Sequence, residues 1–220
     1  MSGGGHLGVL MLDTRFPRLP GDVGHAASFR MPVRYAVVSG AAPRRVVGAT
    51  DVSLLQPFIA VGLALVAGGA RAITTSCGFL IRYQAALQAA LPVPVWSSSL
   101  LKLAELARPG VLTVDAQALG AAELLAAGAR TDIPIEGLRA GCAFQRTLLD
   151  DLASLNEADA QAELVAAAQR LQARDPQIDA LVLECTNMPP YAAAVQAATG
   201  LPVHHLMTLV HERWPALSTP

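Results

Sequence analysis

Three cysteines, Cys77, Cys142 and Cys185, are the residues of this sequence best suited to chemistry on a small molecule. A thiolate can remove a proton from carbon, and the neutral thiol can return one. Three is an odd number, and a chain of 220 residues can bury a core without disulfides. We therefore expect free thiols in a reducing, cytoplasmic setting. Cys142 is expected to be structural, because it has no counterpart elsewhere in the chain.

An internal repeat pairs Cys77 with Cys185. When the sequence is shifted by 108 positions, residues 72–95 align with residues 180–203, and ten of the 24 positions are identical. Five identities are alanine pairs, which this chain produces easily, but the others include a cysteine, a tyrosine and a proline. A second match, at a shift of 102, pairs Gly8, Val9, Leu10 and Asp13 with Gly110, Val111, Leu112 and Asp115. We interpret the two matches as a duplicated unit.

Short apolar runs alternate along the chain with longer segments rich in Ala and Leu. The expected strands are Leu7–Leu12, Val33–Val38, Ala72–Thr74, Val93–Val95, Val111–Val114, Ile133–Ile135, Ala180–Leu183 and Leu201–His205. The expected helices are Leu54–Ala67, Leu80–Ala90, Leu100–Ala107, Ala118–Ala127, Glu157–Arg174 and Tyr191–Thr199. Strands that are apolar on both faces indicate parallel sheets covered by helices. The predicted fold class is α/β, with two pseudo-symmetric, Rossmann-like domains: residues 1–95 plus 204–220, and residues 96–203.

Both repeated cysteines directly follow a predicted strand and precede a predicted helix. Ligands of open parallel sheets bind beyond the carboxyl ends of the strands. If the two domains face each other about a pseudo-twofold axis, Cys77 and Cys185 approach a shared cleft from opposite sides. Glu184 is expected to point away from that cleft, because neighbouring residues of a strand alternate in direction.

Two facing thiols have the chemistry that a racemase without a cofactor needs. One thiolate removes the α-proton, and the opposite thiol delivers a proton to the other face. The following helices are expected to lower the thiol pKa and to offer backbone N–H groups to a carboxylate. Hydroxyl and amide groups beside the cysteines are candidate substrate ligands, namely Thr75, Ser76, Thr186 and Asn187.

The segments Thr74–Phe79 and Leu183–Pro189 resemble the two cysteine motifs of the aspartate/glutamate racemase superfamily, which also includes hydantoin racemases. The resemblance covers nearly the whole chain. It implies a racemase or epimerase, an isomerase independent of pyridoxal phosphate, that acts on a small amino acid or derivative. It further implies that Cys77 and Cys185 are the acid/base pair, that Gly78 contributes to substrate binding, and that the protein is a homodimer.

The sequence departs from the glutamate racemases at two places. Asp13, Thr14 and Arg15 stand where those enzymes carry Asp-Ser-Gly, and Asn187 stands where they carry a histidine. Asn187 cannot transfer a proton, so glutamate is not favoured as the substrate. Asp13 and Thr14 are candidate substrate-binding residues, although Asp13 could equally cap the turn after its strand. Residues 14–31, rich in Pro and Gly, have the length of a lid or binding loop.

Other reactions are compatible with the same superfamily. Some members isomerise maleate or decarboxylate aryl malonates, but those reactions do not use a symmetric thiol pair, so the retained pair favours racemisation. Two alternatives stay open: an isomerase or decarboxylase that uses one catalytic cysteine, and a non-catalytic protein that binds a small carboxylate. A redox disulfide between Cys77 and Cys185 ranks last, because the chain has no CxxC motif.

Composition excludes several classes of function. With 16 basic and 17 acidic residues and no basic run, we expect no nucleic-acid partner. Lys102 is the single lysine that could hold pyridoxal phosphate, and we expect neither cofactor nor metal. The most apolar window, Phe58–Ala70, is too short to cross a bilayer and is expected to be a buried helix. The expected partners are a small carbon acid and a second copy of the chain, and not a membrane.

Overall fold

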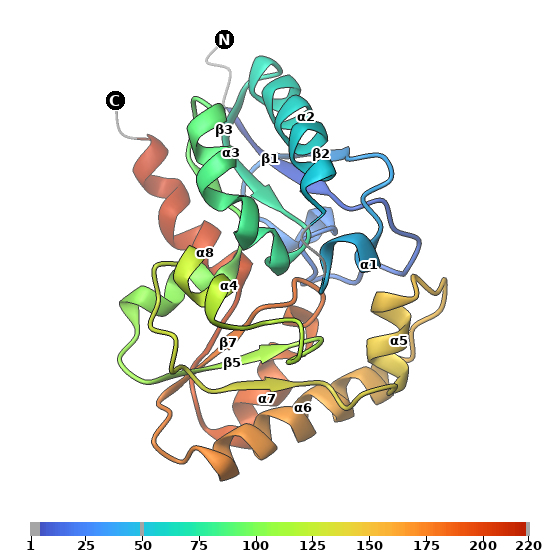
Figure 1. Cartoon of the computed structure of the whole chain (residues 1–220), viewed down its shortest axis with the longest axis vertical. Coiled ribbons are helices and arrows are strands. Elements are labelled where there is room, and N and C mark those ends of the chain that lie inside the picture. The colour runs from blue at the N-terminus through green and yellow to red at the C-terminus, as the bar shows by residue number, and fades with distance from the viewer. Residues whose placement is uncertain (1–4, 49–50, 219–220) are drawn as a thin grey trace.

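The computed structural model describes residues 5–48 and 51–218, whose strands form two four-stranded parallel sheets (Figure 1). In the order β2-β1-β3-β4, the first sheet contains β1 (His6–Met11), β2 (Val33–Val37), β3 (Ala70–Thr75) and β4 (Val95–Trp96). In the order β6-β5-β7-β8, the second contains β5 (Pro109–Thr113), β6 (Ile135–Gly137), β7 (Ala180–Leu183) and β8 (Val203–His204). All the pairings are parallel. The predicted α/β class is therefore confirmed.

The two sheets repeat each other strand for strand. A shift of 108 positions carries β4 onto β8, and the same shift places β3 over β7. In each sheet the strand that precedes a repeated cysteine pairs with the first strand of its half, β3 with β1 and β7 with β5. The internal repeat in the sequence thus corresponds to a repeated topology.

Eight α-helices flank the sheets in the described part of the chain. They are α1 (Pro43–Val46), α2 (Leu55–Ala67), α3 (Gln84–Ala90), α4 (Ala121–Ala126), α5 (Ala143–Leu149), α6 (Glu157–Arg174), α7 (Ala192–Thr199) and α8 (Leu206–Arg213). The bounds of α6 agree with the prediction because Asn156 caps it, its side-chain oxygen accepting the Asp159 N–H at 3.2 Å. Gly200 ends α7 with a φ of +70°, a conformation that glycine adopts easily.

The prediction differs from the structure at several helices. Residues Ser99–Glu105 form a 3₁₀ helix where an α-helix was expected, and another 3₁₀ helix, Gly78–Tyr83, precedes α3. Three helices, α1, α5 and α8, are absent from the predicted set. They are short and mix polar with apolar residues, so they lack the Ala- and Leu-rich pattern on which the prediction depends.

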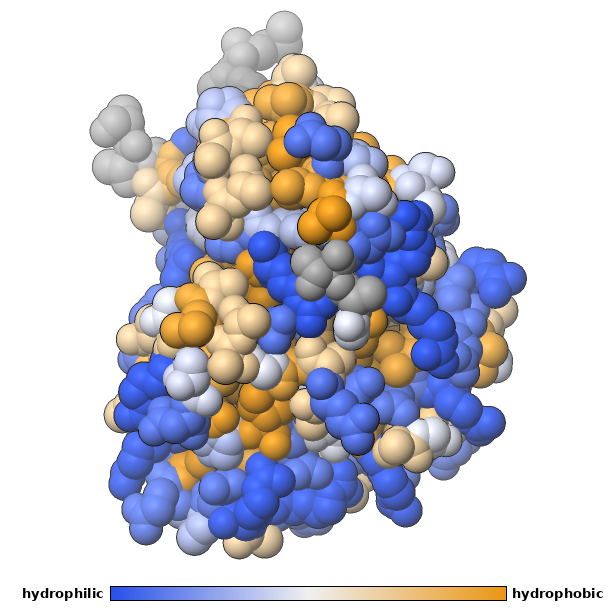
Figure 2. All heavy atoms as spheres, viewed as in Figure 1, coloured by the Kyte–Doolittle hydropathy of each residue, from blue (hydrophilic) through white to orange (hydrophobic). Residues whose placement is uncertain are grey.

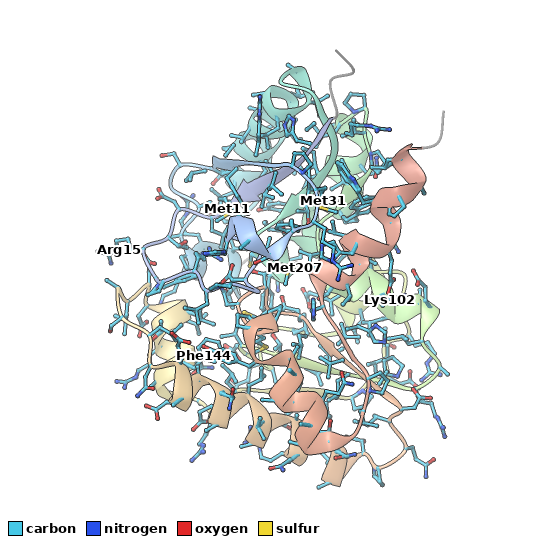
Figure 3. The ribbon with its side chains drawn as sticks, turned by 180° about the vertical axis from the view of Figure 1, so that it is seen from behind. Met11, Arg15, Met31, Lys102, Phe144 and Met207 are labelled. Carbon is cyan, nitrogen blue, oxygen red and sulfur yellow. The ribbon has the colours of Figure 1, made fainter. Side chains whose placement is uncertain are left out.

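The C-terminal helix α8 covers the first sheet. Its buried residues pack with Leu7 and Val9 of β1, and Figure 3 shows Met207 of α8 near Met11 of β1 and Met31. Leu10, which follows Val9 in β1, points to the opposite face of the sheet and packs in a second cluster of buried apolar residues. Helices α2 and α3 cover that second face, so the sheet is buried on both sides.

Helix α2 is buried along one face only. Phe58, Gly62 and Leu65 are buried, whereas Leu63 is 45% exposed. Figure 2 shows apolar residues gathered on the surface over α2 and α3. The expected buried helix is therefore buried on its inner face only, because α2 forms an outer layer of the molecule. None of the helices in the described residues is long and apolar enough to cross a membrane.

Candidate active site

Cys77 and Cys185 occupy equivalent turns just beyond β3 and β7. In each turn the cysteine carbonyl accepts a hydrogen bond at 3.1 Å from the N–H three residues later, that of Leu80 or Met188. Both cysteines are buried, and both line one cavity between the two sheets. Cys142 lies elsewhere, as the N-cap of α5.

The cavity has mostly apolar walls. These come from the loop after β1, the segment around α1, the 3₁₀ helix after Cys77, the end of β5 and α5. The apolar residues are Leu12, Phe16, Pro43, Val47, Phe79, Val114, Leu148 and Leu149. The remaining lining residues belong to the two cysteine turns, and they are Ser76, Cys77, Gly78, Glu184, Cys185, Thr186 and Asn187. Among the described residues, no lysine, arginine or histidine lines the cavity. Its volume is about 30 Å³, room for only one or two water molecules.

Ser76 and Thr186 line the cavity and also join the two halves. The Ser76 hydroxyl oxygen accepts the Leu12 N–H at 2.8 Å, and the Thr186 hydroxyl donates to the Ser76 carbonyl at 2.6 Å. In addition, the Ser99 hydroxyl donates to the Leu183 carbonyl at 2.7 Å. The bond from Thr186 to Ser76 connects the two cysteine turns directly, and the other two bonds hold Ser76 and Leu183 to neighbouring segments.

Three predicted substrate-binding residues lie outside the cavity lining. Thr75 is buried behind the Cys77 turn, where its hydroxyl lies 2.7 Å from the Ser97 carbonyl oxygen and accepts the Cys77 N–H at 3.4 Å. Asp13 is exposed and accepts the Gly40 N–H at 3.1 Å. The Thr14 hydroxyl accepts a hydrogen bond from Arg18 at 3.0 Å. Their contacts support the Cys77 turn and the loop after β1.

Asn187 connects Cys185 with the loop of residues 14–31. The Cys185 thiol donates to Asn187 Oδ1 at 3.6 Å, and Asn187 Nδ2 donates to the Asp22 carboxylate. Asp22 is buried and also accepts hydrogen bonds from Arg18, at 3.1 Å, and from the Gly24 N–H, at 2.6 Å. Sequence reasoning placed Asn187 at the site but found no role for Asp22, which approaches it from a distant part of the chain.

Glu184 lines the cavity, contrary to the expectation that it points away. The strand rule fails because β7 ends at Leu183, so the alternation does not extend to Glu184. Glu184 is only 1% exposed. Its Oε2 accepts a hydrogen bond from the Thr113 hydroxyl at 2.8 Å, and its Oε1 has no hydrogen-bond partner among the described residues. The signal available in the sequence was an acidic residue at the end of an apolar strand, next to a candidate catalytic cysteine.

Gly78 leaves the space that Glu184 occupies. A Cβ at Gly78 would lie 2.2 Å from the Glu184 carbonyl oxygen and 2.3 Å from Oε1. Both distances are far shorter than van der Waals contact. The absence of a side chain at Gly78 therefore allows the two cysteine turns to approach each other.

Burial dominates the protonation of the site. It raises the pKa of the Cys77 thiol to about 12, and the nearby Glu184 charge acts in the same direction. The pKa of Cys185 is raised well above its usual value for the same two reasons. Backbone N–H groups of Phe79 and Asn187 oppose these shifts. The expectation of thiols activated by helix N-termini is therefore wrong. Cys77 is followed by a 3₁₀ helix and Cys185 by a turn, and burial outweighs the N–H groups of both.

Burial also raises the pKa of Glu184, to about 8, although the Thr113 hydrogen bond favours the ionised form. At neutral pH the closed site therefore holds two neutral thiols and a mostly neutral carboxyl group. A positive charge brought into this cavity would favour ionisation of all three. Among the described residues, no group of three or more acidic, cysteine or histidine side chains could hold a metal ion.

Comparisons with known proteins identify both sequence relatives and structural neighbours. No family model matches the sequence. The chain is 30% identical over 214 residues to a dimethylsulfoniopropionate lyase of Durusdinium sp. clade D, covering 90% of this chain and 70% of the relative. It is also 30% identical over 223 residues to dimethylsulfoniopropionate lyase 6 of Emiliania huxleyi (strain CCMP1516). That match covers 92% of this chain and 57% of the Emiliania protein, so the chain spans little more than half of its length.

Solved structures show the same fold. Unliganded arylmalonate decarboxylase has a TM-score of 0.61 and 15% identity, with 96% of this chain and 92% of that one covered. Allantoin racemase from Pseudomonas fluorescens has a TM-score of 0.56 and 16% identity, with 97% of each chain covered. Glutamate racemase RacE1 from Bacillus anthracis has a TM-score of 0.55 and 16% identity, with 96% of this chain and 82% of that one covered. The resemblance to the aspartate/glutamate racemase superfamily is thus confirmed for the fold.

The predicted reaction, however, is wrong. The expectation was a racemase or epimerase, an isomerase, whereas relatives that match about nine-tenths of the chain are lyases. The racemases share at most 16% identity with this chain in the structures compared above, so they support the fold alone. Two thiols in a cleft can start several reactions by removing a proton from carbon, and the groups that the substrate carries determine which product forms.

Proposed function

The chain belongs to the family of dimethylsulfoniopropionate lyases, and we propose that it cleaves dimethylsulfoniopropionate to dimethyl sulfide and acrylate. The substrate is a propionate with a dimethylsulfonium group on its third carbon. A base removes a proton from the carbon next to the carboxylate. The electron pair left behind forms the carbon–carbon double bond, and the bond to sulfur breaks with its electrons going to sulfur. Dimethyl sulfide leaves as a neutral molecule and needs no proton.

The observation that carries the proposal is the chemistry of the cavity between the cysteines. Two thiols and one carboxyl group are the ionisable side chains among the described residues that line it, and the walls are otherwise largely apolar. The chemistry of these walls suits two methyl groups and a positive charge. A second carboxylate, as in aspartate or glutamate, would lie beside Glu184 without a lining cation to neutralise it.

A thiolate is the base that this site can supply. In the closed cavity both thiols are protonated, because burial raises the pKa of Cys77 and of Cys185. A sulfonium group nearby favours the thiolate, and the thiol proton leaves to solvent. The thiolate then takes the α-proton of the substrate and returns it to solvent after the product leaves. The backbone N–H groups at the two cysteine turns are the donors expected to bind the substrate carboxylate.

The two cysteines provide the test of this mechanism. We expect Cys77→Ala or Cys185→Ala, whichever removes the base, to slow dimethyl sulfide release by about 10²–10⁴-fold, the range that general-base catalysis contributes. Cys142→Ala is the matched control, because Cys142 lies outside the cavity, and it should retain normal release. The measurement is headspace gas chromatography with purified variants. Release above a tenth of the wild-type rate by both single variants would exclude a thiol base.

A further inference from the structure

We infer that Glu184 is the counter-ion for a positively charged group of the substrate, so that the site selects small carboxylates that carry a sulfonium or quaternary ammonium group. This inference rests on the proposed function, because it assigns a specificity residue to the same site. It goes further by naming the side chain that recognises the cation.

The position of Glu184 is the first support. A carboxyl group that is 1% exposed in a largely apolar cavity normally has all its hydrogen bonds satisfied. Here Thr113 satisfies Oε2, while Oε1 has no hydrogen-bond partner among the described residues. Gly78, which lacks a side chain, gives Oε1 its space within the cavity lining. A buried carboxylate without a partner is costly unless a positive charge pairs with it.

The surroundings of Glu184 are the second support. Arg82 is close enough to lower the pKa of Glu184, but its Nε lies 2.6 Å from Glu123 and its Nη2 donates to the Ala118 carbonyl. Arg82 does not line the cavity. The cavity therefore offers Glu184 no cationic partner among the described residues, and a cation carried by the substrate fills that role.

The other walls fit the groups around an onium centre. The methyl groups on a sulfonium or ammonium carry part of its charge and are themselves apolar. Phe16 and Phe79 line the cavity together with aliphatic side chains. Aromatic rings attract alkylated cations, and apolar walls bury their methyl groups.

Pairing with a cation has a measurable consequence for protons. With a pKa of about 8, Glu184 is mostly protonated at pH 7 in the free protein. A bound cation stabilises the ionised form, so the carboxyl group releases its proton on binding, up to roughly 0.9 per site at pH 7. A merely structural carboxyl group would release none.

The test compares two inert ligands of the same shape, 3-(trimethylammonio)propanoate and 4,4-dimethylpentanoate. The first is cationic at the position of the sulfonium, and the second has a neutral carbon there. Isothermal titration calorimetry of the full chain at pH 7, in buffers of different ionisation enthalpy, gives affinity and proton release together. We expect the wild type to bind the cationic ligand at least tenfold more tightly and to release close to one proton.

Glu184→Gln keeps the shape of the side chain and an oxygen for the Thr113 hydrogen bond, but it cannot ionise. We expect its preference to fall below threefold and its proton release to fall by close to one proton relative to the wild type. Glu163→Gln is the matched control, because Glu163 also has one oxygen without a hydrogen-bond partner in the described residues yet lies outside the cavity. It should behave as the wild type. Equal binding of both ligands by the wild type, or proton release by Glu184→Gln equal to that of the wild type, would overturn the inference.

Two further measurements separate the possible failures. If Glu184→Gln does not fold, the wild-type preference and proton release still decide the inference. Thr113→Val removes the hydrogen bond that favours ionised Glu184, so it should weaken the preference for the cationic ligand at pH 7. Raising the pH to 9 should restore that preference, because Glu184 then ionises. Cleavage of dimethylsulfoniopropionate is measured separately. A wild type that cleaves it but shows no charge preference refutes the inference alone, whereas a preference without cleavage refutes the proposed function alone.

Discussion

Glu184 shows how a residue that is suited to binding a ligand can lower the stability of the folded protein. Its carboxyl group titrates near 4.5 when exposed and near 8 in the folded protein. At a pH between these two pKa values, Glu184 is ionised in the unfolded chain but still protonated in the folded protein. The folded state therefore loses stability as the pH rises through this window, and the loss is complete above about pH 8. The conflict between stability and charge at Glu184 is typical of functional sites.

The substitution Glu184→Gln removes this conflict. We compare the free energy of unfolding of Glu184→Gln with that of the wild type at two pH values. The gain of the variant over the wild type should be larger at pH 7.5 than at pH 4 by roughly 2–4 kcal/mol. Urea denaturation of both proteins at the two pH values measures the difference. Equal differences at pH 4 and pH 7.5 would mean that Glu184 ionises normally in the folded protein.

At the scale of elements, the loop after β1 closes the cavity against the end of α5. Asp151, with a φ of 54°, accepts the backbone N–H groups of Arg15, at 2.6 Å, and of Phe16, at 3.2 Å. Its other oxygen pairs with the Arg15 guanidinium at 3.1 Å. Figure 3 shows Arg15 at the edge of the molecule, near the end of the helix that carries Phe144. A cavity of about 30 Å³ cannot hold a five-carbon substrate, so this loop is the element expected to move when a substrate enters.

Loss of the Asp151 contacts should therefore favour a conformation in which the loop after β1 has moved away from α5 and the cavity is open. We expect Asp151→Ala to speed the alkylation of Cys77 and Cys185 by iodoacetamide at least threefold, because the thiols become accessible more often. Peptide mass spectrometry over time follows each cysteine. Asp132→Ala, which removes an exposed ion pair with Arg130, is the control. Unchanged rates in Asp151→Ala would show that another segment controls access.

At the scale of the whole molecule, the two sheets share one core. A continuous cluster of buried apolar residues extends from Leu10 in the first half to Val195 in the second. The hydrogen bond from the Thr186 hydroxyl to the Ser76 carbonyl crosses between the halves. Duplication thus produced two sheets that fold against each other, with the candidate site where they meet.

A shared core predicts a single unfolding transition. Calorimetry should give one peak, with equal calorimetric and van't Hoff enthalpies, since neither half can unfold without exposing the common cluster. Two resolved transitions would show that the halves are independently stable. The homodimer and the cytoplasmic location remain predictions.

The sequence predicted those features of the site that depend on repetition and strand order. Cys77 and Cys185 could be paired because both follow equivalent strands, and the α/β class followed from the same pattern. Glu184 was misplaced because the alternation of a strand stops where the strand stops. Asp22 could not be found, since its contact with Asn187 joins segments far apart in the chain. The reaction could not be predicted from the thiols, because racemisation and elimination begin with the same loss of a proton.

Proton nuclear magnetic resonance in deuterium oxide tests the central claim most directly. The purified chain is incubated with dimethylsulfoniopropionate, and the signals of the substrate and of possible products are followed over time. We predict that acrylate and dimethyl sulfide appear in equal amounts as the substrate disappears. Substrate that remains intact, or that gains deuterium at its α-carbon without forming acrylate, would contradict the proposal that this protein is a lyase.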